Sequence, residues 1–113
     1  LLDLCDGDPA LLHGPAVTQA AQAGDPLAIE LLAELGRWIG EGAATAAALV
    51  DPALVVVGGG VAAAGDLLLE PARAGFSAQL SGLGHRPVAA IEPASMGNDA
   101  GLVGAADLAR LAV

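Results

Sequence analysis

The sequence predicts an α/β fold with a parallel sheet, and three observations support this prediction. A short apolar strand, residues 53–57, ends in three successive glycines. A long helical pattern precedes this strand, and another helical pattern separates it from a second short strand, residues 87–92. Strands that alternate with helices are typical of an α/β sandwich in which right-handed crossovers join parallel neighbours. Over residues 15–113 we expect the order helix, helix, strand, helix, strand, helix.

The first helix follows a loop-rich lead-in, residues 1–14. Its pattern covers residues 15–23 and ends at Gly24, which suits a helix C-cap because glycine adopts left-handed backbone angles without steric cost. The pair Asp25-Pro26 predicts the start of the second helix, because Asp is a favoured N-cap and Pro fits the first helical position. Apolar residues then recur at steps of three and four. This long helix ends before Asp51-Pro52, since a residue that precedes proline avoids the α region.

Three glycines lie inside the long helix: Gly36, Gly40 and Gly42. Each costs roughly 1 kcal/mol relative to alanine in a helix interior. Close contact with a neighbouring helix or sheet is the favoured explanation. A flat glycine surface beside a nucleotide is the alternative.

The rest of the chain supplies the third and fourth helices. Residues 65–80 are helical in pattern, with Gly65-Asp66 as the cap and Pro71 near the start. The segment Gly97-Asn98-Asp99 opens the last helix, with Asn98 as N-cap and Asp99 facing the positive helix end. We expect the last helix to pack one apolar side against the sheet, formed by Leu102, Val103, Ala106 and Leu111.

The composition excludes several classes of function. Thirteen acidic residues stand against four arginines and no lysine, and the net charge of −9 argues against binding nucleic acid or an anionic membrane. A chain without lysine cannot form a Walker-type phosphate loop. No uncharged apolar stretch is long enough to span a membrane. The single cysteine, Cys5, allows no internal disulfide, so a cytoplasmic location is expected.

The polar residues of the lead-in do not predict a metal or catalytic site. Cys5 and His13 are eight residues apart, whereas a zinc site needs about four ligands at characteristic spacings. We interpret both as loop residues, and His85 as part of a solvated turn. Three nearby acids have no base or nucleophile close in the sequence and are interpreted as surface charges: Asp3, Asp6 and Asp8. The sequence thus offers no catalytic residue and no metal ligand.

The glycine turn after the first strand is the leading candidate for a ligand site. Glycines let a phosphate or ribose approach bare backbone N–H groups, because no Cβ blocks the way. The spacing Gly58-x-Gly60-x-x-Ala63 formally fits the dinucleotide fingerprint, but the acid expected about 20 residues later is missing. A nucleotide is the leading ligand hypothesis, and a tight turn that binds nothing is the alternative.

Four ordered stretches of the sequence carry a more specific signal. They are residues 23–28 (Ala-Gly-Asp-Pro-Leu-Ala), 35–42 (Leu-Gly-Arg-Trp-Ile-Gly-Glu-Gly), 51–61 together with 64–71, which contain the first strand and its glycines, and 97–110. Together they resemble the C-terminal part of sugar kinases of the ROK (repressor, open reading frame, kinase) family, especially actinobacterial-type glucokinases. The resemblance spans about residues 15–110. We therefore interpret the chain, which also begins without Met, as a C-terminal fragment of a longer protein.

The resemblance implies a fold and an activity. The fold would be part of the C-terminal lobe of an actin-like ATPase (ribonuclease H-like) fold, in which ATP lies between two lobes. The activity would be transfer of the γ-phosphoryl group of ATP to the 6-hydroxyl of glucose, with Mg²⁺. Carried over by position, four residues would bind the cofactor by bordering the ribose and α-phosphate of ATP: Gly58, Gly59, Gly60 and Val61.

The resemblance also implies that most of the kinase machinery lies upstream of this chain. The phosphate loops, the catalytic Asp and a Cys/His zinc site of ROK kinases are not recognisable here, so the chain alone is expected to be inactive. Asn98-Asp99 superficially copies the family's catalytic pair, but its position matches a helix start. A homo-oligomeric parent is expected. A sugar-responsive ROK transcriptional repressor is the alternative, and a module without any ligand is a further one.

Overall fold

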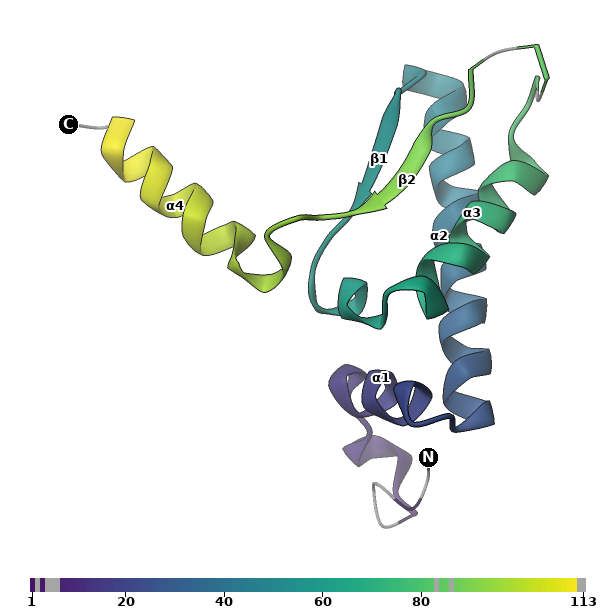
Figure 1. Ribbon diagram of the computed structural model, residues 1–113, viewed down its shortest axis with the longest axis vertical. Helices are drawn as coiled ribbons and strands as arrows, with labels where there is room; N and C mark the ends of the chain where they lie inside the picture. Colours follow the sequence, from purple (N-terminus) through teal and green to yellow (C-terminus); the bar gives the residue numbers. More distant parts are fainter. Residues whose placement is uncertain (2, 4–6, 83, 86, 112–113) are drawn as a thin grey trace.

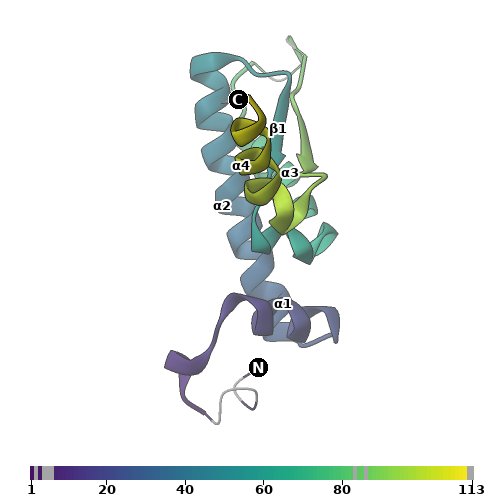
Figure 2. The same ribbon diagram turned by 90° about the vertical axis from the view of Figure 1, so that its left-hand side faces the viewer.

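Two long helices and a small parallel sheet form the body of the molecule. The structure, a computed structural model, describes residues 1, 3, 7–82, 84–85 and 87–111. Helices α2 (Pro26–Val50) and α3 (Asp66–Gln79) lie side by side, and the sheet covers them on one side (Figure 1). Helix α1 (Gly14–Gln22) crosses the beginning of α2 (Figure 2), whereas α4 (Ala100–Leu111) extends away from the body (Figure 1). The predicted order of helices and strands is confirmed.

The sheet has two parallel strands, β1 (Leu54–Val57) and β2 (Ala90–Pro93), with α3 as the crossover between them. Leu54 pairs with Ala90, and Val57 pairs with Pro93. The second strand begins three residues later than predicted. The first ladder bond runs from the Ala90 N–H to the Ala53 carbonyl at 3.2 Å, and Pro87 has no N–H to extend the ladder towards the N-terminus.

The two faces of the sheet have different surroundings. Val57 and Ile91 point towards the helices and are buried with Leu68 and Phe76 of α3. Leu54 and Val56 point the other way and are about half exposed, at 51% and 54%. The described residues therefore cover only one face of the sheet.

The helix caps predicted around the α1–α2 corner are confirmed. Gly24 has a φ of 90° and ends α1 in a Schellman motif. The Asp25 carboxylate accepts a hydrogen bond from the Ala28 N–H at 3.0 Å and so caps α2. Asp51 ends α2 in the left-handed region, with a φ of 44°.

Helices α2 and α3 meet backbone to backbone, which confirms helix contact as the reason for two of the three glycines. A Cβ on Gly36 would overlap the Leu68 carbonyl oxygen, and a Cβ on Gly40 would overlap that of Ala72. The contact is reciprocal, because a Cβ on Gly75 of α3 would lie 2.6 Å from the Arg37 carbonyl oxygen. No described residue outside the local turn of α2 has an atom within 4 Å of the Cβ position of Gly42, so helix contact does not explain that glycine.

Arg73 joins α3 to β2. Its Nε and Nη2 donate to the Ile91 carbonyl at 3.1 and 2.9 Å, and its Nη1 donates to Glu70 at 2.6 Å. Glu92 lies 3.7 Å from Nη2. A guanidinium with several donors in a fixed plane suits this bridging role.

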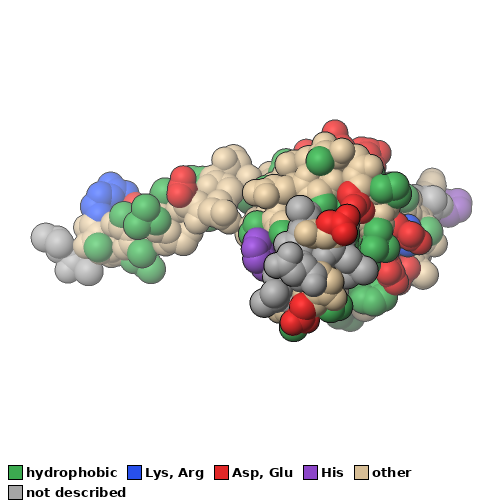
Figure 3. All heavy atoms as spheres, turned by 90° about the horizontal axis from the view of Figure 1, so that it is seen from below, with side chains coloured by type: hydrophobic (Ala, Val, Ile, Leu, Met, Phe, Trp, Pro, Cys, Tyr) green, Lys and Arg blue, Asp and Glu red, His purple; other side chains and the backbone are tan. Residues whose placement is uncertain are grey.

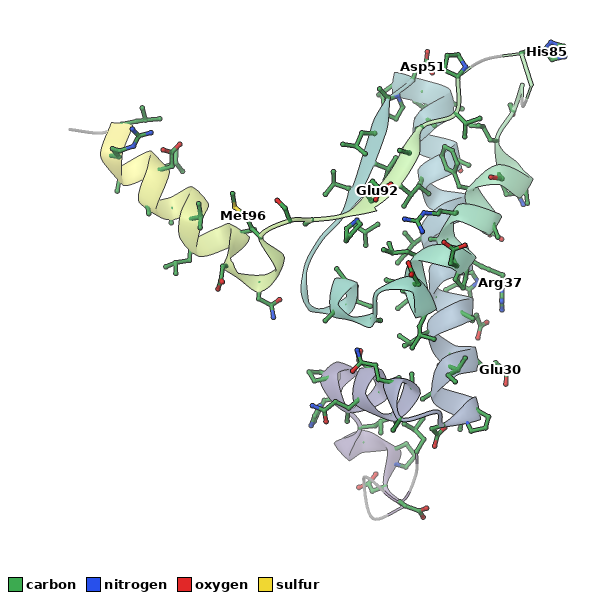
Figure 4. All side chains as sticks on the ribbon, viewed as in Figure 1. Glu30, Arg37, Asp51, His85, Glu92 and Met96 are labelled. Carbon is green, nitrogen blue, oxygen red and sulfur yellow. The ribbon has the colours of Figure 1, made fainter. Side chains whose placement is uncertain are left out.

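The prediction that α4 packs against the sheet is wrong. None of the described residues of α4 is buried, and Leu102, Leu108 and Leu111 are each at least 70% exposed. In Figure 3, α4 is an arm outside the body that carries apolar side chains together with charged ones. The chain bends away from the sheet near Met96 (Figure 4). The apolar side of α4 therefore has no partner among the described residues.

The prediction that Asn98 caps the last helix is also wrong. Residues Gly97–Asp99 form a separate 3₁₀ turn, η4, and α4 begins at Ala100. The Asp99 N–H bonds to the Met96 carbonyl at 3.0 Å, so the backbone closes this turn without help from a side chain. The Asn98 side chain has no hydrogen bond to another described residue.

The described fold leaves much apolar surface uncovered. Its radius of gyration is 16.8 Å, whereas a compact chain of this length has about 13 Å. Its accessible surface is 7163 Å², about 1,600 Å² more than a compact monomer of the same mass exposes. The exposed residues include a stripe along α2, formed by Leu27, Leu31, Leu35, Trp38 and Leu49. None of the described helices combines the length and apolar character needed to cross a bilayer.

The helix contact yields a prediction from a matched pair of glycines in α2. Gly40→Ala should lower the free energy of unfolding by about 1–3 kcal/mol, because its methyl group forces α3 away from α2. Gly42→Ala adds the same methyl group in open space and should raise that free energy by about 0.5–1 kcal/mol, through helix propensity alone. Urea unfolding followed by circular dichroism measures both. Equal stability of the two variants would contradict the described helix contact.

Candidate functional site

The glycine turn lies at the carboxyl ends of the two parallel strands. Gly58 and Gly59 follow β1, and the 3₁₀ helix η3 (Gly60–Ala64) then leads to α3. The chain leaving β2 runs beside this turn: the Ala94 N–H donates to the Val57 carbonyl at 2.8 Å. Open α/β sheets bind ligands in the crevice outside the carboxyl ends of their strands. The structure thus brings the predicted residues to the edge of the sheet where such ligands bind.

Gly59 has a backbone conformation that requires glycine. Its φ is 80° and its ψ is −178°, a region that residues with a Cβ essentially do not adopt. Apart from its chain neighbours, no described residue has an atom within 4 Å of the Cβ position of Gly59. Gly58 and Gly60 are exposed as well, while Val61 is half-buried. The turn therefore presents bare backbone to open space.

An apolar cavity of about 360 Å³ adjoins the far end of the glycine turn. This volume falls within the range of about 300–1,000 Å³ that is typical of small-molecule sites. The sequence did not reveal the cavity, because its walls come from α1, α2 and η3, which no local pattern brings together. It is lined by Gly14, Pro15, Val17, Thr18, Leu32, Leu35, Gly60 and Val61.

Asn98, in the segment that follows β2, lies beside the glycine turn. Its Oδ1 lies 3.8 Å from the Cβ position of Gly60. Turn η4 packs against η3, so the segments that follow β1 and β2 converge on one place. Sequence reasoning treated Asn98 only as a helix cap. Its spacing after the second strand was the signal that could have placed it here.

Among the described residues, no cationic side chain is available at the glycine turn. Arg73 is bonded to Ile91 and Glu70, and Arg110 is bonded to Asp107 on α4. Arg37 lies on the outer side of α2, away from the sheet (Figure 4). Asp99 directly follows Asn98 in η4. A phosphate at the turn would therefore meet backbone N–H groups and no cationic side chain of the described residues.

The histidines and acids of the other segments lie elsewhere. His13 caps α1, with its Nδ1 accepting from the Ala16 N–H at 3.3 Å, and Asp8 caps the 3₁₀ helix η2 (Pro9–Leu11). Asp3 is exposed. His85 lies at the opposite end of the sheet from the glycine turn (Figure 4). Cys5 and Asp6 lie outside the described residues.

No metal site is formed within the described ranges. There, no three His, Cys, Asp or Glu side chains lie close enough together to hold a metal ion. The described residues therefore do not fit a magnesium or zinc centre, and we assign no chemical step to either ion.

These features define an α/β protein with an exposed glycine turn at the carboxyl edge of a parallel sheet and an apolar cavity beside that turn. The chain belongs to the ROK family, whose family model matches residues 3–112. This match confirms the resemblance recognised in the sequence.

Curated relatives share nearly the whole chain. A glucokinase of Streptomyces coelicolor is 48% identical over 110 residues, which are 97% of this chain and 35% of that protein. A glucokinase of Halalkalibacterium halodurans is 35% identical over 95 residues, or 83% of this chain and 28% of that protein. The chain thus spans about a third of the length of these relatives.

Solved structures show the same fold. The crystal structure of a ROK family glucokinase from Streptomyces griseus, in complex with glucose and AMPPNP, matches with a TM-score of 0.88 and 46% identity. That match covers 97% of this chain and 35% of the other. A putative sugar kinase from Cytophaga hutchinsonii matches with a TM-score of 0.68 and 30% identity, over 88% of this chain and 33% of the other. The predicted actin-like ATPase fold class is confirmed.

Proposed function

We propose that the chain is part of the C-terminal lobe of an ATP-dependent glucokinase and supplies the adenosine side of its ATP site. The full-length protein would transfer the γ-phosphoryl group of ATP to the 6-hydroxyl of glucose. The observation that supports this proposal most directly is the glycine turn, residues 58–61, at the carboxyl edge of the sheet. There Gly59 has a backbone conformation that only glycine readily adopts, and its surface is open to a ligand. The named relatives are glucokinases, which favours a kinase over the alternative, a repressor.

The site has a natural division between base, ribose and phosphate. The flat adenine ring suits the apolar cavity beside Val61, where Leu32 and Leu35 form part of the wall. The ribose and α-phosphate would then lie over Gly59, whose Cβ position no described side chain approaches within 4 Å, and beside Gly60, where Asn98 is the neighbouring side chain. AMPPNP, an ATP analogue, is bound in the Streptomyces griseus relative, which supports a nucleotide as the ligand of this fold.

The uncovered surfaces support the assignment to a partial lobe. We assign residues 1–14 to a lead-in and residues 15–113 to the lobe itself. The outer face of the sheet, the stripe along α2 and the apolar residues of α4 belong to three different elements, and all of them are exposed. The relatives are almost three times as long as this chain. We infer that the additional part of a full-length protein covers these surfaces.

A chimera can test the proposed ATP site. Residues 1–113 would replace the matching third of the Streptomyces griseus glucokinase, and glucose-dependent ATP consumption would be measured. In this chimera, Gly59→Val should raise the KM for ATP at least about tenfold, because the new side chain occupies the ligand space and strains a backbone with positive φ. The KM for glucose should change less than about twofold.

Gly84→Val is the matched control for this change. Gly84 has a φ of 85° and open space at its Cβ position, but it lies beside His85, remote from the glycine turn. The control variant should therefore carry a similar backbone strain and keep the KM for ATP. A folded Gly59→Val chimera with an unchanged KM for ATP would show that the turn does not border the nucleotide.

The 113-residue chain by itself should not phosphorylate glucose. Phosphoryl transfer requires a base at the acceptor hydroxyl and groups that stabilise the β- and γ-phosphates, and the described residues place neither at the glycine turn. A coupled assay with the purified chain should show no glucose-dependent ATP consumption, while the chimera assayed in parallel should. Turnover by the purified chain would refute this prediction.

A further inference from the structure

We propose that Asn98 hydrogen-bonds the ribose hydroxyls of the bound nucleotide and makes the site prefer ribonucleotides to deoxyribonucleotides. The inference deepens the proposed function and rests on it, because it needs a nucleotide over the glycine turn.

The position of Asn98 is the first observation. Its Oδ1 lies 3.8 Å from the Cβ position of Gly60, so its amide group stands beside the exposed backbone of the turn. Asn98 comes from the segment after β2, whereas Gly60 comes from the segment after β1. A nucleotide held at the carboxyl edge of both strands would lie within reach of both segments.

The second observation is that the Asn98 amide has hydrogen-bonding capacity to spare. It is exposed, and it bonds to no other described residue. An asparagine amide has a carbonyl acceptor and two N–H donors. A ribose hydroxyl both donates and accepts, so the two groups match.

The backbone holds Asn98 in place without using its side chain. The Gly97 N–H bonds to the Ala94 carbonyl at 3.4 Å, and the Asp99 N–H bonds to the Met96 carbonyl at 3.0 Å. Gly97 has a φ of 50°, which gives the turn a conformation that glycine adopts easily. The backbone that carries Asn98 is therefore fixed before a ligand arrives, and only the side chain has to be ordered on binding.

The local charge favours ribose over phosphate as the group that Asn98 contacts. Asp99 follows it directly, and a carboxylate repels phosphate oxygens but accepts hydrogen bonds from sugar hydroxyls. The described arginines offer no compensating charge here, because Arg73 and Arg110 are bonded elsewhere. The geometry and the charge thus both favour the ribose, which is neutral and carries hydroxyl groups, as the part of the nucleotide that Asn98 contacts.

The chimera described above provides the test, with ATP, 2′-deoxy-ATP and 3′-deoxy-ATP as substrates. The unmodified chimera should show a KM for ATP about tenfold lower than that for at least one deoxy analogue. Asn98→Ala should raise the KM for ATP to the value of that analogue and leave the analogue's own KM unchanged, since the lost bond is made only to the missing hydroxyl.

Two further variants complete the design. Ser95→Ala removes an exposed hydroxyl from the same segment and should leave the discrimination intact. In Asn98→Ser the side chain is too short for its hydroxyl to reach the position of the amide, so this variant should lose the discrimination as Asn98→Ala does. It replaces the alanine variant in the test if that variant does not fold.

Three results would overturn the proposal. In the first, the unmodified chimera does not distinguish ATP from either analogue. In the second, the Asn98→Ala chimera keeps the discrimination, and in the third, Asn98→Ala raises the KM equally for all three nucleotides. If Gly59→Val raises the KM for ATP while Asn98→Ala keeps the discrimination, only the role of Asn98 fails. If Gly59→Val also leaves the KM for ATP unchanged, the proposed function and this inference fail together.

Discussion

The backbone contact between α2 and α3 is the constraint on which the rest of the structure depends. Gly36, Gly40 and Gly75 remove the side chains that would otherwise hold the two helices apart. Leu68 and Phe76 of α3 are then buried almost completely. Val57 of β1 and Ile91 of β2 are buried in one core with Leu68 and Phe76, so the paired strands pack against the helix pair that this contact forms. The position of the glycine turn at the carboxyl edge of the sheet is a consequence of this pairing.

Glycine therefore has two different structural roles in this short chain. In the helices it permits close approach of two backbones with ordinary helical angles. In the turn, Gly59 permits a conformation that other residues avoid, with open space around it. The sequence showed glycines in both places but could not separate the two uses. Gly40 and Gly42 illustrate the difficulty, since they are two residues apart in one helix and only Gly40 meets another backbone.

Features with a local physical cause could be predicted from the sequence. Gly24, the Asp25-Pro26 pair and the glycine turn depend on backbone angles and caps within a few residues, and the structure has them where they were expected. Features that depend on distant partners could not be predicted. The apolar pattern of α4 shows which side avoids water but not what covers it. Asn98 was misassigned because asparagine favours both turns and helix caps.

The charge distribution also limits what this segment contributes to an ATP site. The chain has a net charge of −9, and its described residues place no cationic side chain beside the glycine turn. An apolar cavity, bare backbone and an amide suit a base and a sugar, whereas a triphosphate needs strong donors or cations. In the proposed enzyme, the groups that stabilise the β- and γ-phosphates must then come from the part that also covers the apolar surfaces. Nucleotide binding and burial of the exposed apolar surfaces would then depend on the same contact, between this segment and the rest of the full-length enzyme.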